Sequence, residues 1–201
     1  MSAGGGRLEF WYEFSSTYSY IAAMRIEALA EAAGVAIDWK PFLLGPIFQA
    51  QGWNTSPFNL YPAKGRYMVR EMERLAEQHD VPFRMPAVFP QNSLLAARLA
   101  LVGVESGWIV AFTKAVYLAE FRDGLDISSK AVLEDILRGL QLDPAELFES
   151  VAMSDVKERL KDQTDLAQES GIFGAPSFMV GEELFWGNDR LEQALELARR
   201  G

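Results

Sequence analysis

Strand patterns stand only at the two ends of this chain, and helical patterns fill the stretch between them. Residues 8–14 are rich in aromatic side chains and predict a buried strand, while residues 35–40 alternate between apolar and polar and predict a half-buried one. Between them, residues 18–33 carry an apolar stripe at helical spacing, and Gly34 ends the helix. This β-α-β order favours a parallel pair of strands joined by a right-handed crossover.

The carboxyl-terminal end returns to strand patterns. Residues 177–180 and 184–186 flank Gly181-Glu182-Glu183, which predicts a hairpin. A last helix is predicted after residues 187–189, because an apolar stripe at helical spacing follows them.

Together the two ends predict one α/β sheet with a large all-helical insertion. We expect a sheet domain of residues 7–44 plus 172–201 and an inserted helical domain of residues 45–171. Glycine and proline recur in residues 42–65, so we expect this segment to be irregular. A loop of that length in a compact domain is often functional.

The composition fits a folded domain and excludes several classes of partner. The 201 residues are 49% hydrophobic, enough for a sizeable core. With 19 basic and 28 acidic side chains the net charge is −9, which argues against a nucleic-acid surface. No apolar run approaches the roughly 18 to 20 residues of a membrane span, so we expect no membrane partner and a cytoplasmic location.

Cysteine is absent, and His79 is the only histidine. The lack of cysteine excludes disulfides, thiolate metal sites, iron–sulfur clusters and a cysteine nucleophile. A single histidine cannot build a multi-histidine metal site, and we expect no metal.

The first candidate site is Ser16, at the junction of the first strand and the first helix. A hydroxyl here, from Ser16 or Thr17, is typical of a helix N-cap that accepts a backbone N–H. The same hydroxyl can also face a ligand, because a helix N-terminus carries partial positive charge and stabilises anions such as a thiolate. Both interpretations can hold together, since a hydroxyl donates one hydrogen bond and accepts others.

The second candidate is Ala175-Pro176, directly before a strand. A trans peptide bond at a strand start is the commoner alternative. If the bond is cis, the backbone of Ala175 turns outward and can pair with an extended peptide.

The third candidate is Asn188-Asp189, before the last helix. One interpretation is that Asn188 caps this helix and that Asp189 complements its dipole. The other is that the helix end holds a ligand carboxylate while Asp189 accepts from a ligand ammonium, which together would recognise the end of an α-amino acid.

The order of these features resembles the DsbA family of thioredoxin-type disulfide oxidases. That family carries Cys-x-x-Cys at the helix start and a cis proline before the hairpin. Ser16 and Ser19 stand at both cysteine positions here, which excludes dithiol–disulfide exchange.

The chain is also similar, over nearly its whole length, to the 2-hydroxychromene-2-carboxylate isomerases and to the related kappa class of glutathione transferases. This resemblance implies a thioredoxin-like fold of the DsbA and kappa type, glutathione as cofactor and a homodimer. It is carried by the order and spacing of several segments, which are residues 14–20, 40–45, 62–67, 89–93 with Arg98, 171–178 and 186–190.

The resemblance implies roles for individual residues. Ser16 would donate to the glutathione thiolate, and Ala175, before Pro176, would pair through its backbone with the cysteinyl unit. Asn188 and Asp189 would hold the γ-glutamyl end. Lys64 and Asn54 would contact glutathione or substrate carboxylates. For Tyr20 the residues leave two alternatives, a position in the core, which is the commoner one, or substrate binding in an apolar pocket beside Ser16.

Two positions depart from the family pattern. Thr17 stands where a proline usually follows the reactive serine, and Glu71 stands where an aspartate is common. The first change leaves the helix start intact.

Three functions follow as alternatives. The resemblance implies a glutathione-dependent cis–trans isomerase that converts a small aromatic carboxylate, 2-hydroxychromene-2-carboxylate, to trans-o-hydroxybenzylidenepyruvate by reversible thiolate addition. A kappa-like transferase that conjugates small electrophiles would use the same residues. The third alternative is a non-redox binding module that holds an extended peptide against Ala175-Pro176.

Overall fold

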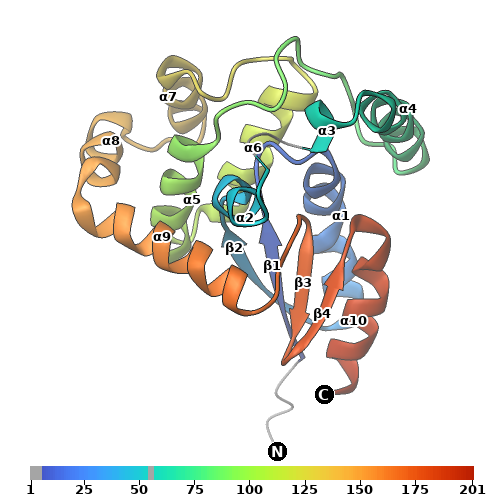
Figure 1. The fold of residues 1–201 in the computed structure, drawn as a ribbon. Coiled ribbons are helices and arrows are strands. Elements are labelled where there is room, and N and C mark those ends of the chain that lie inside the picture. The colour runs from blue at the N-terminus through green and yellow to red at the C-terminus, as the bar shows by residue number, and fades with distance from the viewer. Residues whose placement is uncertain (1–5, 54–56) are drawn as a thin grey trace, which may run out of the picture.

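A computed structural model describes residues 6–53 and 57–201 of the chain. Its sheet has the strand order β2-β1-β3-β4 and joins both ends of the sequence, as predicted (Figure 1). β1 (Arg7–Tyr12) pairs in parallel with β2 (Ala36–Pro41) and antiparallel with β3 (Ser177–Val180), which pairs with β4 (Glu183–Trp186) in a hairpin. β1 is therefore a central strand, which explains its aromatic composition.

The side chains of β1 alternate between two cores. Leu8, Phe10 and Tyr12 enter the larger core, where the Phe10 ring lies 5.1 Å from that of Trp39 and 5.5 Å from that of Phe178. Trp11 points to the other face and joins a smaller core with residues of α2, α9 and β3. The period of two along a strand produces this division.

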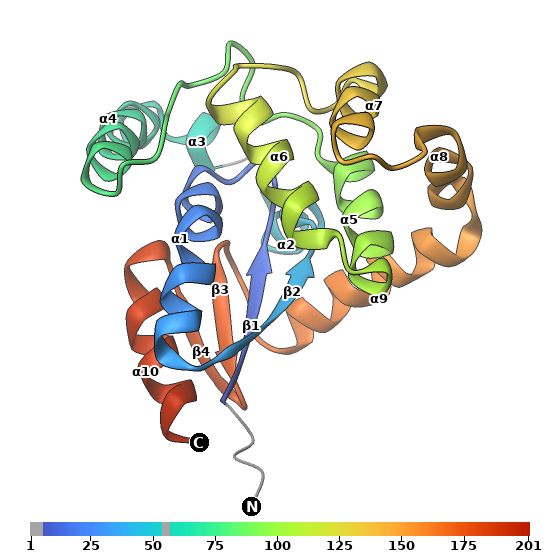
Figure 2. The same ribbon diagram turned by 180° about the vertical axis from the view of Figure 1, so that it is seen from behind.

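Helices cover both faces of the sheet and extend beyond its ends (Figure 2). α1 and α10 pack together behind β1 and β3, while α9 crosses the opposite face near β2 (Figures 1 and 2). Within the described residues, no helix is both long and apolar enough to cross a membrane. The helices are α1 (Thr17–Ala33), α2 (Leu44–Ala50), α3 (Pro57–Leu60), α4 (Pro62–Gln78), α5 (Leu94–Ser106), α6 (Ile109–Phe121), α7 (Lys130–Gly139), α8 (Pro144–Ala152), α9 (Ser154–Glu169) and α10 (Leu191–Arg200), the last preceded by a 3-10 turn, Asn188–Arg190.

The segment 42–65 departs from the prediction of irregular structure. It contains α2, α3 and the first residues of α4. Pro62 occupies the first turn of α4, where a missing backbone N–H costs nothing because no partner lies within the helix. The proline content therefore marked helix starts rather than an uninterrupted loop.

The first strand is also shorter than predicted. It ends at Tyr12, and Glu13 to Ser16 form the turn into α1. The backbone N–H of Ser16 donates to the Glu13 carbonyl at 3.1 Å and closes this turn. Glu13 is thus a turn residue at the carboxyl end of the central strand, beside the start of α1.

Candidate active site

A cavity of about 1100 Å³ lies where β1 ends and α1 begins. The β1–α1 turn, α2, the first turns of α4, residues 89–94 and residues 173–175 line it, so that it joins segments far apart in the sequence. Small-molecule sites commonly measure about 300–1,000 Å³, so there is room for two ligands side by side.

Ser16 lies in the wall of this cavity and caps α1. Its hydroxyl accepts from the backbone N–H of Ser19 at 3.2 Å, which confirms the predicted cap. The hydroxyl also donates to the Ala175 carbonyl at 3.1 Å. Two candidates separated by 159 residues therefore meet at one point.

The peptide bond between Ala175 and Pro176 is cis, the second of the two alternatives that the sequence left open. Ala175 lines the cavity, and its carbonyl is held by Ser16. The Pro176 carbonyl accepts from the Gly187 N–H at 3.0 Å, which ties the loop to the end of β4. The loop is therefore fixed on both sides.

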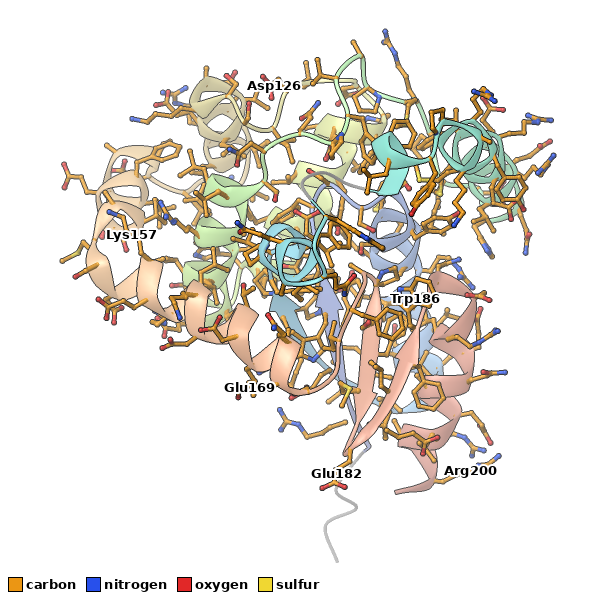
Figure 3. All side chains as sticks on the ribbon, in the orientation of Figure 1. Asp126, Lys157, Glu169, Glu182, Trp186 and Arg200 are labelled. Atoms are coloured by element: carbon orange, nitrogen blue, oxygen red, sulfur yellow. The ribbon has the colours of Figure 1, made fainter. Side chains whose placement is uncertain are left out.

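An aromatic pair forms one edge of the cavity. Trp186 ends β4 (Figure 3), and its ring lies 4.9 Å from that of Phe173. Both side chains are exposed and line the cavity. A Cβ on Gly174 would lie 2.4 Å from Trp186 Nε1, so a larger residue there would have to displace this ring.

Lys64 reaches the same cavity from the first turns of α4. Its side chain is exposed, and Nζ lies 4.8 Å from the centre of the Tyr61 ring. The expected position of Lys64 in the site agrees with the structure, and its ammonium supplies positive charge to the cavity of an acidic chain.

Asn188 and Asp189 lie outside the cavity lining. Asn188 is buried, and its Oδ1 accepts from Arg25 at 2.9 Å. Gly187 is the N-cap of the 3-10 turn and Arg190 is the N-cap of α10. The interpretation that Asn188 caps the last helix is therefore wrong. Asp189 is exposed and pairs with Arg190 at 3.0 Å.

Tyr20 is a core residue, and its expected contact with a substrate does not fit the structure. The side chain has no exposed surface, and its hydroxyl donates to the Pro82 carbonyl. Its ring packs 5.8 Å from Tyr117 and 5.2 Å from Phe121. Tyr20 lies one helical turn after Ser16, where the side chain already points into the core. Asn54 lies outside the described residues.

Sequence reasoning missed Glu13, which also lines the cavity. The side chain is only 6% exposed, and its Oε1 accepts from the Ser93 hydroxyl. Burial raises the pKa of Glu13 to about 7, and the hydrogen bonds from Ser93 and the Ser15 backbone reduce this rise. The available signal was an acid directly after an aromatic strand and three residues before the candidate serine.

Comparison with known proteins places the whole chain in one family. Residues 7–198 match the model of the DSBA-like thioredoxin domain. The chain belongs to this DsbA-like family. The resemblance drawn from the sequence and the predicted thioredoxin-like fold with helices inserted between its two halves are both confirmed.

Several relatives of this DsbA-like protein are enzymes. The 2-hydroxychromene-2-carboxylate isomerase of Sphingobium xenophagum is 30% identical and is aligned over 92% of this chain and 94% of its own length. Human glutathione S-transferase kappa 1 is 25% identical over 92% of this chain and 87% of its own. A solved 2-hydroxychromene-2-carboxylate isomerase superposes with a TM-score of 0.87 at 25% identity, covering 96% of this chain and 95% of that one.

The donor set of this DsbA-like site fits a thiol ligand. Ser16 places a hydroxyl at the N-terminus of α1, where it can donate to sulfur and lies in a positive potential. The cis loop presents Ala175 in the same wall, and Lys64 provides a cation for a carboxylate. Since the chain has no cysteine, any thiol at this point must come from a bound molecule.

Proposed function

We propose that this chain is a glutathione-dependent cis–trans isomerase of the 2-hydroxychromene-2-carboxylate type, acting on a small aromatic carboxylate. The observation that carries the proposal is the Ser16 hydroxyl, which caps α1 and lies 3.1 Å from the carbonyl of the cis Ala175 inside the cavity. Similarity to isomerases over almost the whole chain supports the same reaction.

When bound, glutathione would supply a thiolate that adds reversibly to the conjugated double bond of the substrate and so permits rotation about it. Ser16 would donate to this sulfur. The hydroxyl would exchange its present bond to Ala175, worth about 0.5–1.5 kcal/mol, for a bond to a charged group, worth about 1.5–3 kcal/mol. The end of α1 adds about 0.3–2 kcal/mol in favour of the anion.

The remaining residues would position the ligands. Lys64 would orient a carboxylate, and the Ala175 backbone would pair with the cysteinyl unit. Asn188 and Asp189 are proposed to hold the γ-glutamyl end, from a place beyond the described lining of the cavity. The aromatic residues Trp53, Phe58 and Phe89 line the cavity and offer an apolar surface to the substrate ring.

The partners expected from the resemblance are part of the proposal. We propose a homodimer in the cytoplasm with glutathione and a small aromatic carboxylate as ligands, and the names of the isomerase and transferase relatives support the two ligands. Size-exclusion chromatography with light scattering checks the dimer directly.

The test combines binding with product analysis. Calorimetry with glutathione should show one site per chain, and the purified protein should convert 2-hydroxychromene-2-carboxylate to the trans benzylidenepyruvate only when glutathione is added. Glutathione should be recovered unchanged. Absence of binding at millimolar concentration, or conversion at the same rate without glutathione, would reject the proposal.

A conjugating transferase is the second candidate, because kappa-class transferases align with more than nine-tenths of the chain. It would use the same residues and differ only in its product. A stable thioether formed from a small electrophile, with glutathione consumed in equal amount, would favour this candidate over the isomerase. A binding module that holds an extended peptide against Ala175-Pro176 would use the same backbone, and the absence of glutathione binding in calorimetry would favour it.

A further inference from the structure

Glu13 is an acid built into the wall of the cavity. It follows the last residue of β1 and precedes Ser16 by three residues, and the two residues line the same space. Hydrogen bonds hold both its backbone and its side chain. The Glu13 carbonyl accepts from Ser16 N–H at 3.1 Å and from the Tyr117 hydroxyl at 2.9 Å, while the carboxyl group accepts from Ser93.

The surroundings of Glu13 favour its neutral form. From α6, Glu120 and Tyr117 face it, and Glu120 has no exposed surface and no hydrogen-bond partner for either carboxyl oxygen within the described residues. Ser93, directly before α5, provides a hydroxyl, and the buried Nε of Arg98 on α5 has no hydrogen-bond partner in the described part of the chain, Glu13 included. The charge of Glu13 raises the pKa of Glu120, and two buried acids that interact in this way without a paired cation cannot readily both be ionised.

A buried carboxylic acid that keeps its proton near neutral pH is suited to one task in a pocket. It can donate to an oxygen on which negative charge develops, as preorganised donors do in oxyanion sites. A carboxylate would instead repel such charge. The ring-opened form of the substrate proposed above, a benzylidenepyruvate, has such an oxygen, the keto oxygen conjugated to the double bond.

We propose that Glu13 is a catalytic acid of this site, which donates its proton to the keto oxygen of the substrate while the conjugated double bond is opened, and takes the proton back when the double bond returns. This inference rests on the proposed isomerase function and adds a second catalytic residue beside Ser16.

The proton and electron balance closes within one turnover. Addition of a nucleophile at the carbon distal to the ketone would move the electron pair of the double bond toward the keto group, and the keto oxygen would take the proton from Glu13. The O–H bond of Glu13 would break and an O–H bond of an enol would form. After rotation, the Glu13 carboxylate would remove that proton, and the ketone would re-form as the nucleophile leaves with its own electron pair. No net proton is consumed.

One test needs no glutathione. In infrared difference spectra, the protein should show a carboxyl group that titrates near pH 7 and is missing in Glu13→Gln. Adding trans-o-hydroxybenzylidenepyruvate, the proposed product, should shift this carboxyl band, because the keto oxygen accepts from it. An absent band, or a band that the product leaves unmoved, would overturn the inference even if the enzyme isomerises its substrate.

The second test is the pH profile of kcat. The neutral form of Glu13 is active, so kcat should fall about tenfold per pH unit once the pH exceeds both the pKa of Glu13 and that of the bound thiol. Glu13→Gln should lower kcat by roughly 10²–10³-fold and abolish this alkaline fall, and Glu13→Ala should be slower still because it also loses the hydrogen bond. Glu31→Gln, an exposed acid on α1, is the matched control and should leave the profile unchanged.

The outcomes distinguish a failure of the proposed isomerase function from a failure of the role assigned to Glu13. If the parent protein does not need glutathione, the proposed function fails, and the infrared experiment still decides whether Glu13 contacts the keto acid. If the parent requires glutathione but Glu13→Gln keeps the alkaline fall, the role of Glu13 is refuted and the isomerase stands. Glutamine matches glutamate in shape, so Glu13→Gln remains informative if Glu13→Ala does not fold.

Discussion

Replacing Ser16 by alanine removes two hydrogen bonds at once. The hydroxyl no longer accepts from Ser19 N–H, at 3.2 Å, and no longer donates to the Ala175 carbonyl, at 3.1 Å. Loss of an N-cap costs about 1 kcal/mol, and loss of the second bond about another 1 kcal/mol. We therefore expect Ser16→Ala to lower the free energy of unfolding by about 2 kcal/mol, measured by urea denaturation.

Ser16→Ala should also change the pKa of a bound thiol. Donation to a thiolate exceeds donation to a neutral carbonyl by about 1–2 kcal/mol, so removing the hydroxyl should raise the pKa of bound glutathione by about one unit, at 1.36 kcal/mol per unit. The assay is the ultraviolet absorbance of the thiolate against pH, at saturating glutathione. Below the thiol pKa, the thiolate fraction and kcat should both fall by about tenfold.

Asp143→Ala is the matched control. Asp143 caps α8 by accepting from Ala145 N–H at 2.9 Å, and it does not line the cavity. Its loss should lower the free energy of unfolding by about 1 kcal/mol, as expected for loss of the cap alone, without changing the pKa of the bound thiol. If the two variants leave the bound thiol with the same pKa, Ser16 is a cap only and the reasoning about its second role is refuted.

Three other changes test neighbouring claims. Gly174→Ala places a Cβ 2.4 Å from Trp186 Nε1 and should cost about 1–3 kcal/mol of stability, seen as a lower Tm, with weaker glutathione binding in calorimetry; an unchanged Tm would show that the ring moves freely. Burial and the charge of Glu13 raise the pKa of Glu120 well above 4.5, so the folded state holds a proton that the unfolded state releases, and the free energy of unfolding should fall as pH rises above about 4.5. Glu120→Gln should flatten this fall in denaturation curves taken across that range. An equal slope in the variant would contradict the assignment of Glu120 as a buried, protonated acid. Lys64→Met should raise the KM for the aromatic carboxylate by about tenfold with little change in kcat, as expected for a loss of about 1.4 kcal/mol of uniform binding, whereas an unchanged KM would remove Lys64 from the substrate site.

Most of the secondary structure could be predicted from the sequence because the patterns that indicate it are local. Alternation in residues 35–40, the apolar stripe of residues 18–33 and the hairpin glycine at Gly181 each report on a few neighbouring residues, and β2, α1 and the β3–β4 hairpin follow them. That both ends share one sheet followed from topology, since two strand regions flanking a helical block must pair to be buried.

The site was only partly accessible because its residues owe their roles to distant partners. Ser16 looked like a cap and is one, but its contact with Ala175 spans 159 residues. The side chain of Asn188 is held by Arg25 rather than by the helix it precedes, and no local pattern encodes that choice. Glu13 reads as an ordinary polar turn residue until α5 and α6 close over it and remove its solvent.

The short contact between Ser16 and Ala175 also restricts how a thiol can enter. A sulfur atom cannot lie between a hydroxyl and a carbonyl that are 3.1 Å apart, so it must approach Ser16 from the cavity side. The hydroxyl would then turn away from Ala175, and the carbonyl would become available to a backbone N–H of the ligand. Under the proposed function, binding of a cysteinyl peptide would therefore replace one internal hydrogen bond by two intermolecular ones at Ser16 and Ala175.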